Sequence, residues 1–231
     1  MVRSAPSDRT PTALSPLPPN PWGGRRRGAV GILGGSFNPA HEGHRHVSLL
    51  ALKALRLDEV WWLVSPQNPL KPVRGMAPQS QRIAEARRVS HHPRIRVSGM
   101  EGQFGTRFTA DTLRCLRRRF PRLRFVWLMG ADNLAQIPRW DRWLDIFRCV
   151  PIAIFDRSSY SFRALAGKAA HRHGASRMDP SRIRGLLLRT PPAWSFLHSR
   201  LHSASSTGIR ARRTDPHQDG KSTPIGLGEH P

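Results

Sequence analysis

Cysteine is almost absent from this sequence. Cys115 and Cys149 are the only two cysteines among 231 residues. Two thiols are too few for a disulfide framework, and their spacing matches no metal-binding cysteine motif. We therefore expect a protein of a reducing compartment, in which both cysteines serve as small buried side chains.

Long hydrophobic runs are also missing. No stretch of the chain approaches the roughly 20 apolar residues that a membrane-spanning helix requires. The first residues lack the apolar core of a secretory signal peptide. These absences predict a cytoplasmic protein that has no membrane partner.

Acidic residues are scarce relative to basic ones. The chain has 15 Asp and Glu against 38 Lys and Arg, a formal net charge of +23, and arginine supplies 34 of the basic residues. A nucleic-acid-binding surface usually combines lysine and arginine in clusters, whereas a GC-rich genome can place arginine at many neutral surface positions. The charge suits any anionic partner, nucleotides included, and does not by itself favour nucleic acid as the main partner.

Proline and polar residues dominate both ends of the chain. Residues 1–27 are rich in proline and have little to bury, so we expect a disordered tail there. Residues 214–231 are again polar, with several Pro and Gly, and are predicted to form a loose tail. The remaining residues, 28–213, are enough for a single domain with a hydrophobic core.

Between the tails, short β-rich runs alternate with helical patterns. Strands are expected at residues 29–33, 59–64, 94–97, 123–129, 152–155 and 194–198. Helical spacing of apolar residues is found at 43–57, 78–90, 109–120, 139–147 and 161–171. This alternation predicts an α/β fold with a doubly wound, mostly parallel sheet, whose ligand site lies beyond the carboxyl ends of the strands.

The turn that follows residues 29–33 is the most informative segment. Gly34 and Gly35 let the backbone come close to an anion, and the first amides of the next helix point at the same place. His41 and His44 lie three residues apart at the start of that helix and project to one side. The turn has neither the dinucleotide-binding glycine pattern nor the Gly-Lys-Ser/Thr of a P-loop. Two imidazoles without a third ligand make an incomplete metal site, so we predict no metal centre built by the protein.

Two motifs carry a resemblance to a known family. Residues 34–44 read Gly-Gly-Ser-Phe-Asn-Pro-Ala-His-Glu-Gly-His, which resembles the signature of the nucleotidyltransferase superfamily that has a His-x-Gly-His motif. Residues 205–210 read Ser-Ser-Thr-Gly-Ile-Arg, which is similar to an element near the end of bacterial nicotinate mononucleotide adenylyltransferases. Hydroxyls and amides at a helix start, followed by a guanidinium, suit phosphate oxygens.

Three further segments resemble the same family. Residues 64–71 are similar to its loop after the second strand, where a lysine faces substrate phosphate. Residues 107–113 look like its aromatic-Thr-x-x-Thr-Leu segment, with phenylalanine in the aromatic position. Residues 130–134 and 138–140 look like its Gly-x-Asp and Trp elements. The resemblance therefore spans residues 30–213.

The resemblance implies a Rossmann-like enzyme of NAD biosynthesis. Such an enzyme moves AMP from ATP to nicotinate mononucleotide, giving nicotinate adenine dinucleotide and pyrophosphate, by direct in-line attack without a covalent intermediate. The catalytic residues would be His41, His44 and Arg210. ATP would be bound by Gly34, Gly35, Ser36, Phe37, Asp132, Ser206 and Thr207. The mononucleotide would be bound by Lys71, Phe108, Thr109 and Trp140. Mg2+ would accompany ATP, held largely by phosphate and water.

Other interpretations stay open at this point. One histidine of the pair could cap the helix while the other packs. Asp132 and residues 205–210 could be ordinary helix caps, Lys71 a surface residue, and Phe108 and Trp140 core residues. The chain could instead be another adenylyl or cytidylyl transferase of the superfamily, such as a phosphopantetheine adenylyltransferase, or a basic nucleic-acid-binding module that retains the fold. Asn38 stands where many relatives have Asp, and residues 171–192 match nothing in the family pattern. A homo-oligomer is also left open.

Overall fold

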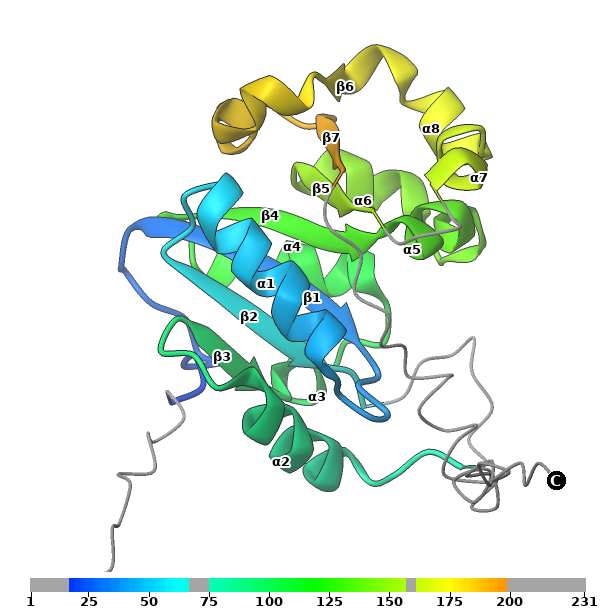
Figure 1. Cartoon of the computed structure of the whole chain (residues 1–231). Helices are drawn as coiled ribbons and strands as arrows, with labels where there is room; N and C mark the ends of the chain where they lie inside the picture. Colours follow the sequence, from blue (N-terminus) through cyan, green and yellow to red (C-terminus); the bar gives the residue numbers. More distant parts are fainter. Residues whose placement is uncertain (1–16, 67–74, 157–160, 199–231) are drawn as a thin grey trace, which may run out of the picture.

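A seven-stranded parallel sheet forms the centre of the protein. The computed structural model describes residues 17–66, 75–156 and 161–198. The strands lie in the order β3-β2-β1-β4-β5-β7-β6, and each neighbouring pair is parallel (Figure 1). Their bounds are β1 Gly28–Gly35, β2 Glu59–Val64, β3 Ile95–Ser98, β4 Leu123–Gly130, β5 Ile152–Phe155, β6 Arg177–Met178 and β7 Trp194–Leu197.

The central strands are apolar on both sides because helices cover both faces of the sheet. All six residues of β2 are buried, Trp61 and Trp62 included. Trp61 contributes to the hydrophobic core on one face, and Trp62 to the core on the other. Successive side chains of a strand point to opposite faces, so a doubly covered strand reads as a continuous hydrophobic run. This explains why the sequence of these strands does not alternate.

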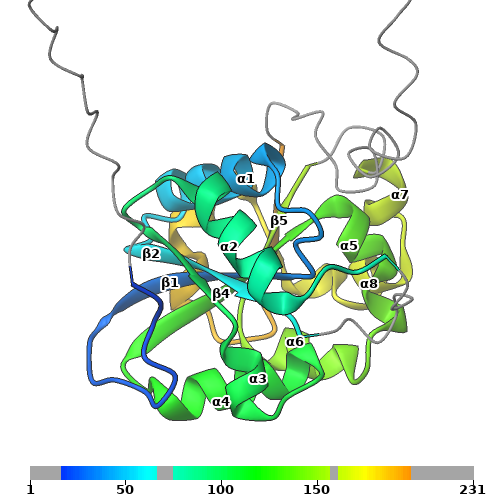
Figure 2. The same cartoon turned by 90° about the horizontal axis from the view of Figure 1, so that it is seen from below.

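The helices form two layers, one on each face (Figure 2). One layer contains α1 Glu42–Ala54, α2 Gln79–Ser90 and the 3-10 segment η4 Pro180–Leu188. The other layer contains α3 Met100–Phe104, α4 Thr109–Arg119, α5 Ala131–Gln136, α6 Trp143–Cys149, α7 Ser161–Leu165 and α8 Lys168–Arg172. Two short 3-10 turns, η1 Ile137–Arg139 and η3 Gly174–Ser176, complete the described elements. The predicted doubly wound parallel architecture is confirmed.

The expected elements are present, with local differences. Each of the six predicted strands is found within two residues of its expected ends. The helix expected over residues 139–147 begins later, at Trp143, because residues 137–139 form η1. The helix expected over 161–171 is divided into α7 and α8 around Gly167, which has an extended ψ of 162°. Short elements such as α3, α5 and β6 were not predicted, since a few residues carry too little periodicity.

Residues 17–27 lie against the domain, although the sequence places them in a disordered tail. The Arg119 side chain donates a 2.6 Å hydrogen bond to the carbonyl of Pro21, and its own carbonyl accepts one from the Gly24 amide. Arg26 forms an ion pair with the buried carboxylate of Glu59 at 2.9 Å. These contacts are hydrogen bonds to backbone carbonyls and one ion pair. A prediction based on hydrophobicity does not detect such contacts. We call residues 17–27 the N-terminal arm.

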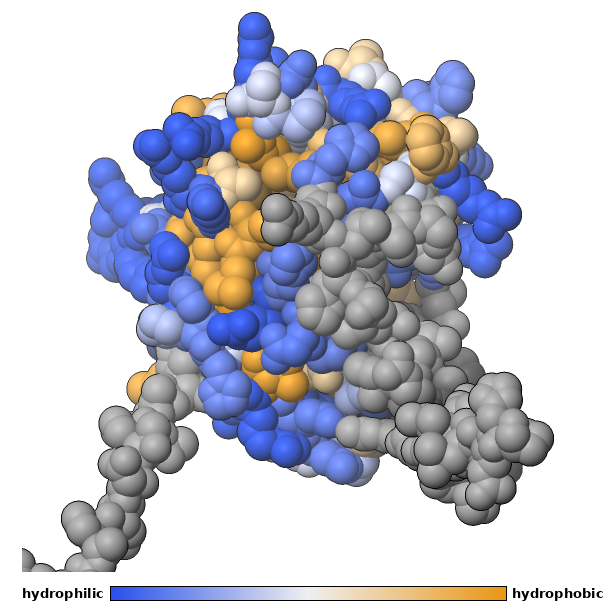
Figure 3. All heavy atoms as spheres, viewed as in Figure 1, coloured by the Kyte–Doolittle hydropathy of each residue, from blue (hydrophilic) through white to orange (hydrophobic). Residues whose placement is uncertain are grey.

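Hydrophobic residues gather on part of one face of the molecule. Figure 3 shows a hydrophobic strip over the region of α1, surrounded by hydrophilic residues. Val47, Leu49 and Leu50 of α1 are partly buried and pack against the core on that side. Within the described ranges, no helix has both the length and the apolar character needed to cross a membrane. Cys149 is buried, as expected, whereas Cys115 is half-buried.

Candidate active site

The turn after β1 lies where the sheet changes its direction of winding. The chain runs from β1 outward to β2 and β3, and then returns to place β4 on the other side of β1. Ligands of open α/β sheets bind at the carboxyl edge beside such a switch point. The glycine turn follows the carboxyl end of β1, and the Gly130–Asp132 segment follows the carboxyl end of β4. The two predicted nucleotide-binding segments are therefore neighbours.

His41 and His44 are fixed by a reciprocal capping arrangement at the start of α1. Nδ1 of His41 accepts a hydrogen bond from the Gly43 amide at 3.1 Å, and Nδ1 of His44 accepts one from the His41 amide at 3.2 Å. The two ring centroids are 3.9 Å apart. Because each Nδ1 is an acceptor, a neutral ring carries its proton on Nε2. Both imidazoles are thus preset as Nε2 donors, which is the form that suits a phosphate oxygen.

Aromatic packing holds His44 in place from behind. Phe37 is buried, its ring lies 4.7 Å from that of His44, and it stacks on Trp62 at 5.1 Å. The indole of Trp62 donates a 2.8 Å hydrogen bond to Ser48, whose hydroxyl donates to the carbonyl of His44. The side chain of Phe37 therefore belongs to the core, and only its backbone could meet a nucleotide.

The two glycines of the turn have different reasons to be glycine. A Cβ on Gly34 would stand 2.3 Å from Cη2 of Trp127, so packing alone excludes a side chain there. A Cβ on Gly35 would meet only Phe37, at an ordinary 3.6 Å. The protein interior thus leaves room for a methyl group at Gly35. The close approach of a ligand to Gly35 stays a prediction.

Asp132 lies in the first turn of α5, directly after β4. It follows β4, the strand that neighbours β1, whereas the histidine pair follows β1 itself. Within the helix, its carboxylate is favourably placed near the amino-terminal amides. The predicted contact with the adenosine ribose stays a prediction.

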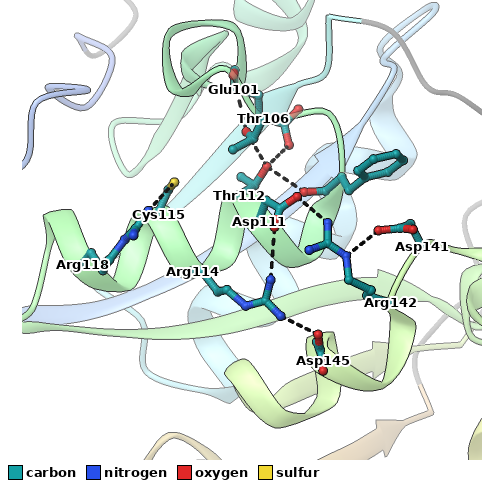
Figure 4. A network of polar contacts seen from close by, with 11 residues as sticks. Glu101, Thr106, Asp111, Thr112, Arg114, Cys115, Arg118, Asp141, Arg142 and Asp145 are labelled. Atoms are coloured by element: carbon teal, nitrogen blue, oxygen red, sulfur yellow. Dashed lines mark hydrogen bonds and ion pairs between the residues drawn. The ribbon is translucent and has the colours of Figure 1, made fainter.

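An ion network connects the segments that carry Phe108 and Trp140. Arg142, two residues after Trp140, pairs with Asp111 of α4 at 2.5 Å and with Asp141 at 2.6 Å. Figure 4 shows Arg142 between Asp111 and Asp141. Its guanidinium lies 5.9 Å from the centroid of the Phe108 ring. Phe108 and Trp140 are both half-buried. The structure thus brings the two predicted mononucleotide-binding aromatics onto adjoining segments, and Thr109 begins α4 beside them.

The buried carboxyl group of Glu101 is linked to the Phe108 segment through Thr112. Glu101 accepts a 3.1 Å hydrogen bond from Thr112, and the Thr112 hydroxyl lies 2.9 Å from that of Thr106 (Figure 4). Burial raises the pKa of Glu101 to about 7, although the Thr112 bond opposes the shift. Thr112 also lies within hydrogen-bond distance of the Phe108 carbonyl, at 3.3 Å. The loop between α3 and α4 is therefore shaped by a group that titrates near neutrality.

The other predicted site residues cannot be placed. Lys71, Ser206, Thr207 and Arg210 lie outside the described residues. The expectation that an arginine from the end of the chain joins the histidine pair therefore stays a prediction. In the parts that the structure describes, no group of three His, Cys, Asp or Glu could hold a metal ion.

Comparison with known proteins decides the family. A model of the cytidylyltransferase-like family matches residues 32–212. A probable nicotinate-nucleotide adenylyltransferase from Cereibacter sphaeroides is 54% identical over 182 residues, which cover 79% of this chain and 96% of the relative. The chain belongs to the nicotinate-nucleotide adenylyltransferase family.

Other members of this family support the same conclusion. Proteins of the same name from Parvibaculum lavamentivorans and Methylorubrum extorquens are 52% and 49% identical, each over 183 residues. The match covers 79% of this chain in both cases, and 91% and 99% of the two relatives. The solved structure of Plasmodium falciparum nicotinic acid mononucleotide adenylyltransferase complexed with APC has a TM-score of 0.58 at 17% identity, covering 80% of this chain and 83% of that one. This likeness shows the shared fold.

Sequence reasoning missed three residues that connect segments of the candidate site: Arg82, Glu101 and Arg142. None of them belongs to a recognised motif, and each acts through residues distant in the chain. An arginine or glutamate in a helical pattern is usually read as solvated. Only the fold shows that Arg82 and Glu101 are buried.

Proposed function

We propose that this protein transfers AMP from ATP to nicotinate mononucleotide, producing nicotinate adenine dinucleotide and pyrophosphate. The observation that carries this proposal is the histidine pair, whose Nε2 donors stand at the switch point of the sheet. The high identity to relatives named nicotinate-nucleotide adenylyltransferase supports the choice of substrates.

The reaction is a displacement at the α-phosphorus of ATP. A phosphate oxygen of the mononucleotide forms the new P–O bond, the bond to the β-phosphate oxygen breaks, and pyrophosphate leaves with the electron pair. The attacking phosphate is already ionised near neutral pH, so no protein base is needed. The protein must hold two polyanions in line and disperse the charge that grows on the leaving group.

Each predicted residue receives a specific task in this reaction. His41 and His44 donate from Nε2 to phosphate oxygens of ATP, and the backbone at Gly35 comes close to the nucleotide. Arg210, with Ser206 and Thr207, would hold the β- and γ-phosphates. Phe108 and Trp140 would flank the nicotinate ring, and Lys71 would contact a phosphate. When bound with ATP, Mg2+ supplies charge neutralisation of the triphosphate.

The first test compares substrates in one coupled assay. Pyrophosphate release should require both ATP and a pyridine mononucleotide, and nicotinate mononucleotide should be used in preference to 4′-phosphopantetheine. Chelation of divalent metal should abolish the activity, and added Mg2+ should restore it. Efficient use of phosphopantetheine or cytidine nucleotides instead would favour another transferase of the superfamily. Comparison of nicotinate and nicotinamide mononucleotides would measure the ring preference. A cytoplasmic location and a homo-oligomer stay predictions.

The second test removes one donor of the pair. His44→Ala should lower kcat by ~100-fold or more, as loss of a single donor to transition-state charge does elsewhere. His46→Ala, two residues further along α1, is the matched control and should change kcat by less than about twofold. Normal pyrophosphate release by the His44→Ala protein would contradict the proposed site.

A further inference from the structure

Arg82 is a fully buried arginine in the first turn of α2, with 1% of its surface exposed. Its guanidinium donates hydrogen bonds to four backbone carbonyls, of Ser36 at 2.5 Å, Ser65 at 2.9 Å, Pro66 at 2.8 Å and Ala77 at 2.8 Å. These carbonyls belong to the turn after β1, the loop after β2 and the segment that leads into α2. One side chain therefore joins three segments at the carboxyl edge of the sheet.

The charge of Arg82 has no carboxylate partner among the described residues. Burial lowers the pKa of the guanidinium, but an arginine remains protonated in proteins. A desolvated cation held only by carbonyl dipoles is costly to keep in a folded protein. A hydrophobic residue of similar size would avoid that cost but would leave these four carbonyls without their donor. The charged side chain is therefore kept for what it holds together.

The location of Arg82 shows what its side chain holds together. Ser36, whose carbonyl it binds, stands between Gly35 and Phe37 in the proposed nucleotide-binding turn. Ser65 binds the same turn from the other loop, through its amide and hydroxyl to the Gly35 carbonyl at 3.0 and 3.3 Å. Arg82 thus fixes the backbone of this turn directly and also fixes the loop that supports it. Its positive charge lies immediately behind the turn that we expect to face a phosphate.

We propose that Arg82 is a positioning residue for adenylyl transfer, which clamps the β1 turn to the β2 loop and supplies the unpaired positive charge that a bound nucleotide's phosphates neutralise. This inference rests on the proposed function. The guanidinium fork is needed for the clamp, because lysine has a single nitrogen and cannot span four carbonyls in different directions. The charge is effective because it acts through a poorly solvated interior.

The test separates the clamp from the charge with two substitutions. Arg82→Lys keeps the charge and loses the fork, whereas Arg82→Gln loses both. Arg88→Gln is the control, because Arg88 is an exposed arginine in the last turns of the same helix. For each protein, kcat and KM for ATP and nicotinate mononucleotide would be measured, together with the folded fraction by circular dichroism and thermal unfolding.

We expect Arg82→Gln to lower kcat by ~100-fold, since a displacement of the turn by an ångström misaligns the reacting groups. Its KM for ATP should rise by ~10-fold or more because the compensating charge is lost. Arg82→Lys should show the lower kcat with a smaller rise in KM, and Arg88→Gln should resemble the wild-type protein. The proposal is overturned if folded Arg82→Gln keeps both constants within about twofold of wild type. It is also overturned if a lower folded fraction fully accounts for the lower kcat of both variants.

A second measurement keeps the test valid if Arg82→Gln does not fold. Methylguanidine added to Arg82→Ala, whose short side chain leaves a cavity, should partly restore kcat per folded molecule if a guanidinium at this place positions the turn; an absence of rescue in the folded variant counts against it. Calorimetric binding of inorganic tripolyphosphate does not depend on the choice of acceptor substrate. If the wild-type protein lacks adenylyl transfer but binds tripolyphosphate in an Arg82-dependent way, the proposed function fails, and only the part of the inference that concerns the charge of Arg82 stands. Arg82→Lys, which keeps the charge, should bind tripolyphosphate nearly as tightly as wild type, and equal affinity in wild-type and Arg82→Gln proteins overturns the role of the charge.

Discussion

Gly34 and Gly35 are adjacent in the chain but meet different surroundings. Trp127 covers the space where Gly34 would carry a side chain, while the space beside Gly35 is open to the turn. The same residue type therefore serves packing at one position and, in our proposal, ligand approach at the next. Sequence reading assigns both glycines to an anion, and only the structure separates them.

This difference leads to a paired prediction. Gly34→Ala should destabilise the protein by ~1–3 kcal/mol, the usual cost of overpacking a filled interior. Gly35→Ala should change the free energy of unfolding by less than about 1 kcal/mol, yet reduce kcat/KM, because the new methyl group enters the ligand's space. Urea unfolding and steady-state kinetics on both variants check this. Full activity of Gly35→Ala would remove the ligand explanation, and a normally stable Gly34→Ala would contradict the packing one.

Glu101 gives a residue-scale prediction about pH. Its pKa is raised to about 7 in the folded protein from an ordinary 4.5. Its contribution to stability is therefore fully present below pH 4.5 and is lost as the pH rises to 7, a change of about 3 kcal/mol by linkage. Glu101→Gln is neutral at every pH and should remove this part of the slope. Between pH 5 and pH 8, the free energy of unfolding measured with urea should therefore fall less for Glu101→Gln than for wild type. Parallel stability profiles for the two proteins would disprove the raised pKa.

At the scale of elements, the N-terminal arm lies at the amino edge of the sheet, opposite the candidate site. It contacts the first residue of β2 through Arg26 and the last residue of α4 through Pro21 and Gly24. Burial opposes ionisation of Glu59, but bonds from Arg26, Trp61 and Arg96 lower its pKa overall. The arm therefore covers the amino edge of the sheet, where no substrate is expected to bind.

Gly23 provides the test of the arm. It has a φ of +112°, and a Cβ there would stand 2.4 Å from the Arg119 carbonyl oxygen. Gly23→Ala should displace the arm and lower stability by ~1–2 kcal/mol, with kcat and KM unchanged. Gly174→Ala, where the added Cβ meets nothing within 4 Å, is the matched control for thermal unfolding. A loss of activity at unchanged stability would mean that the arm acts on the site.

At the scale of the whole molecule, charge is the dominant property. A net charge of +23 produces a positive potential that attracts polyanionic substrates and is screened by salt. The KM for ATP should therefore rise several-fold between ~10 mM and ~300 mM NaCl, whereas kcat should change little. A KM that is independent of salt would show that local contacts alone bind ATP.

The same positive charge could also bind nucleic acid, and the affinity for duplex DNA separates the two cases. Filter binding of duplex DNA should show only weak affinity at physiological salt, in the ~10⁻⁴–10⁻⁶ M range of non-specific binding. Much tighter binding would favour the nucleic-acid-binding module over the enzyme.

The sequence by itself determined the fold class, the strand positions, the family and the residues of its motifs. Hydrophobic runs and helical spacing act locally, and the glycine turn with His41 and His44 is contiguous in the chain. The tertiary structure decided what depends on residues distant in sequence. It fixed the tautomers of the histidines within a capped helix start, assigned Trp127 to Gly34, and buried Arg82 and Glu101 beneath the site. Burial of a charge depends on which segments cover it, and no local pattern contains that information.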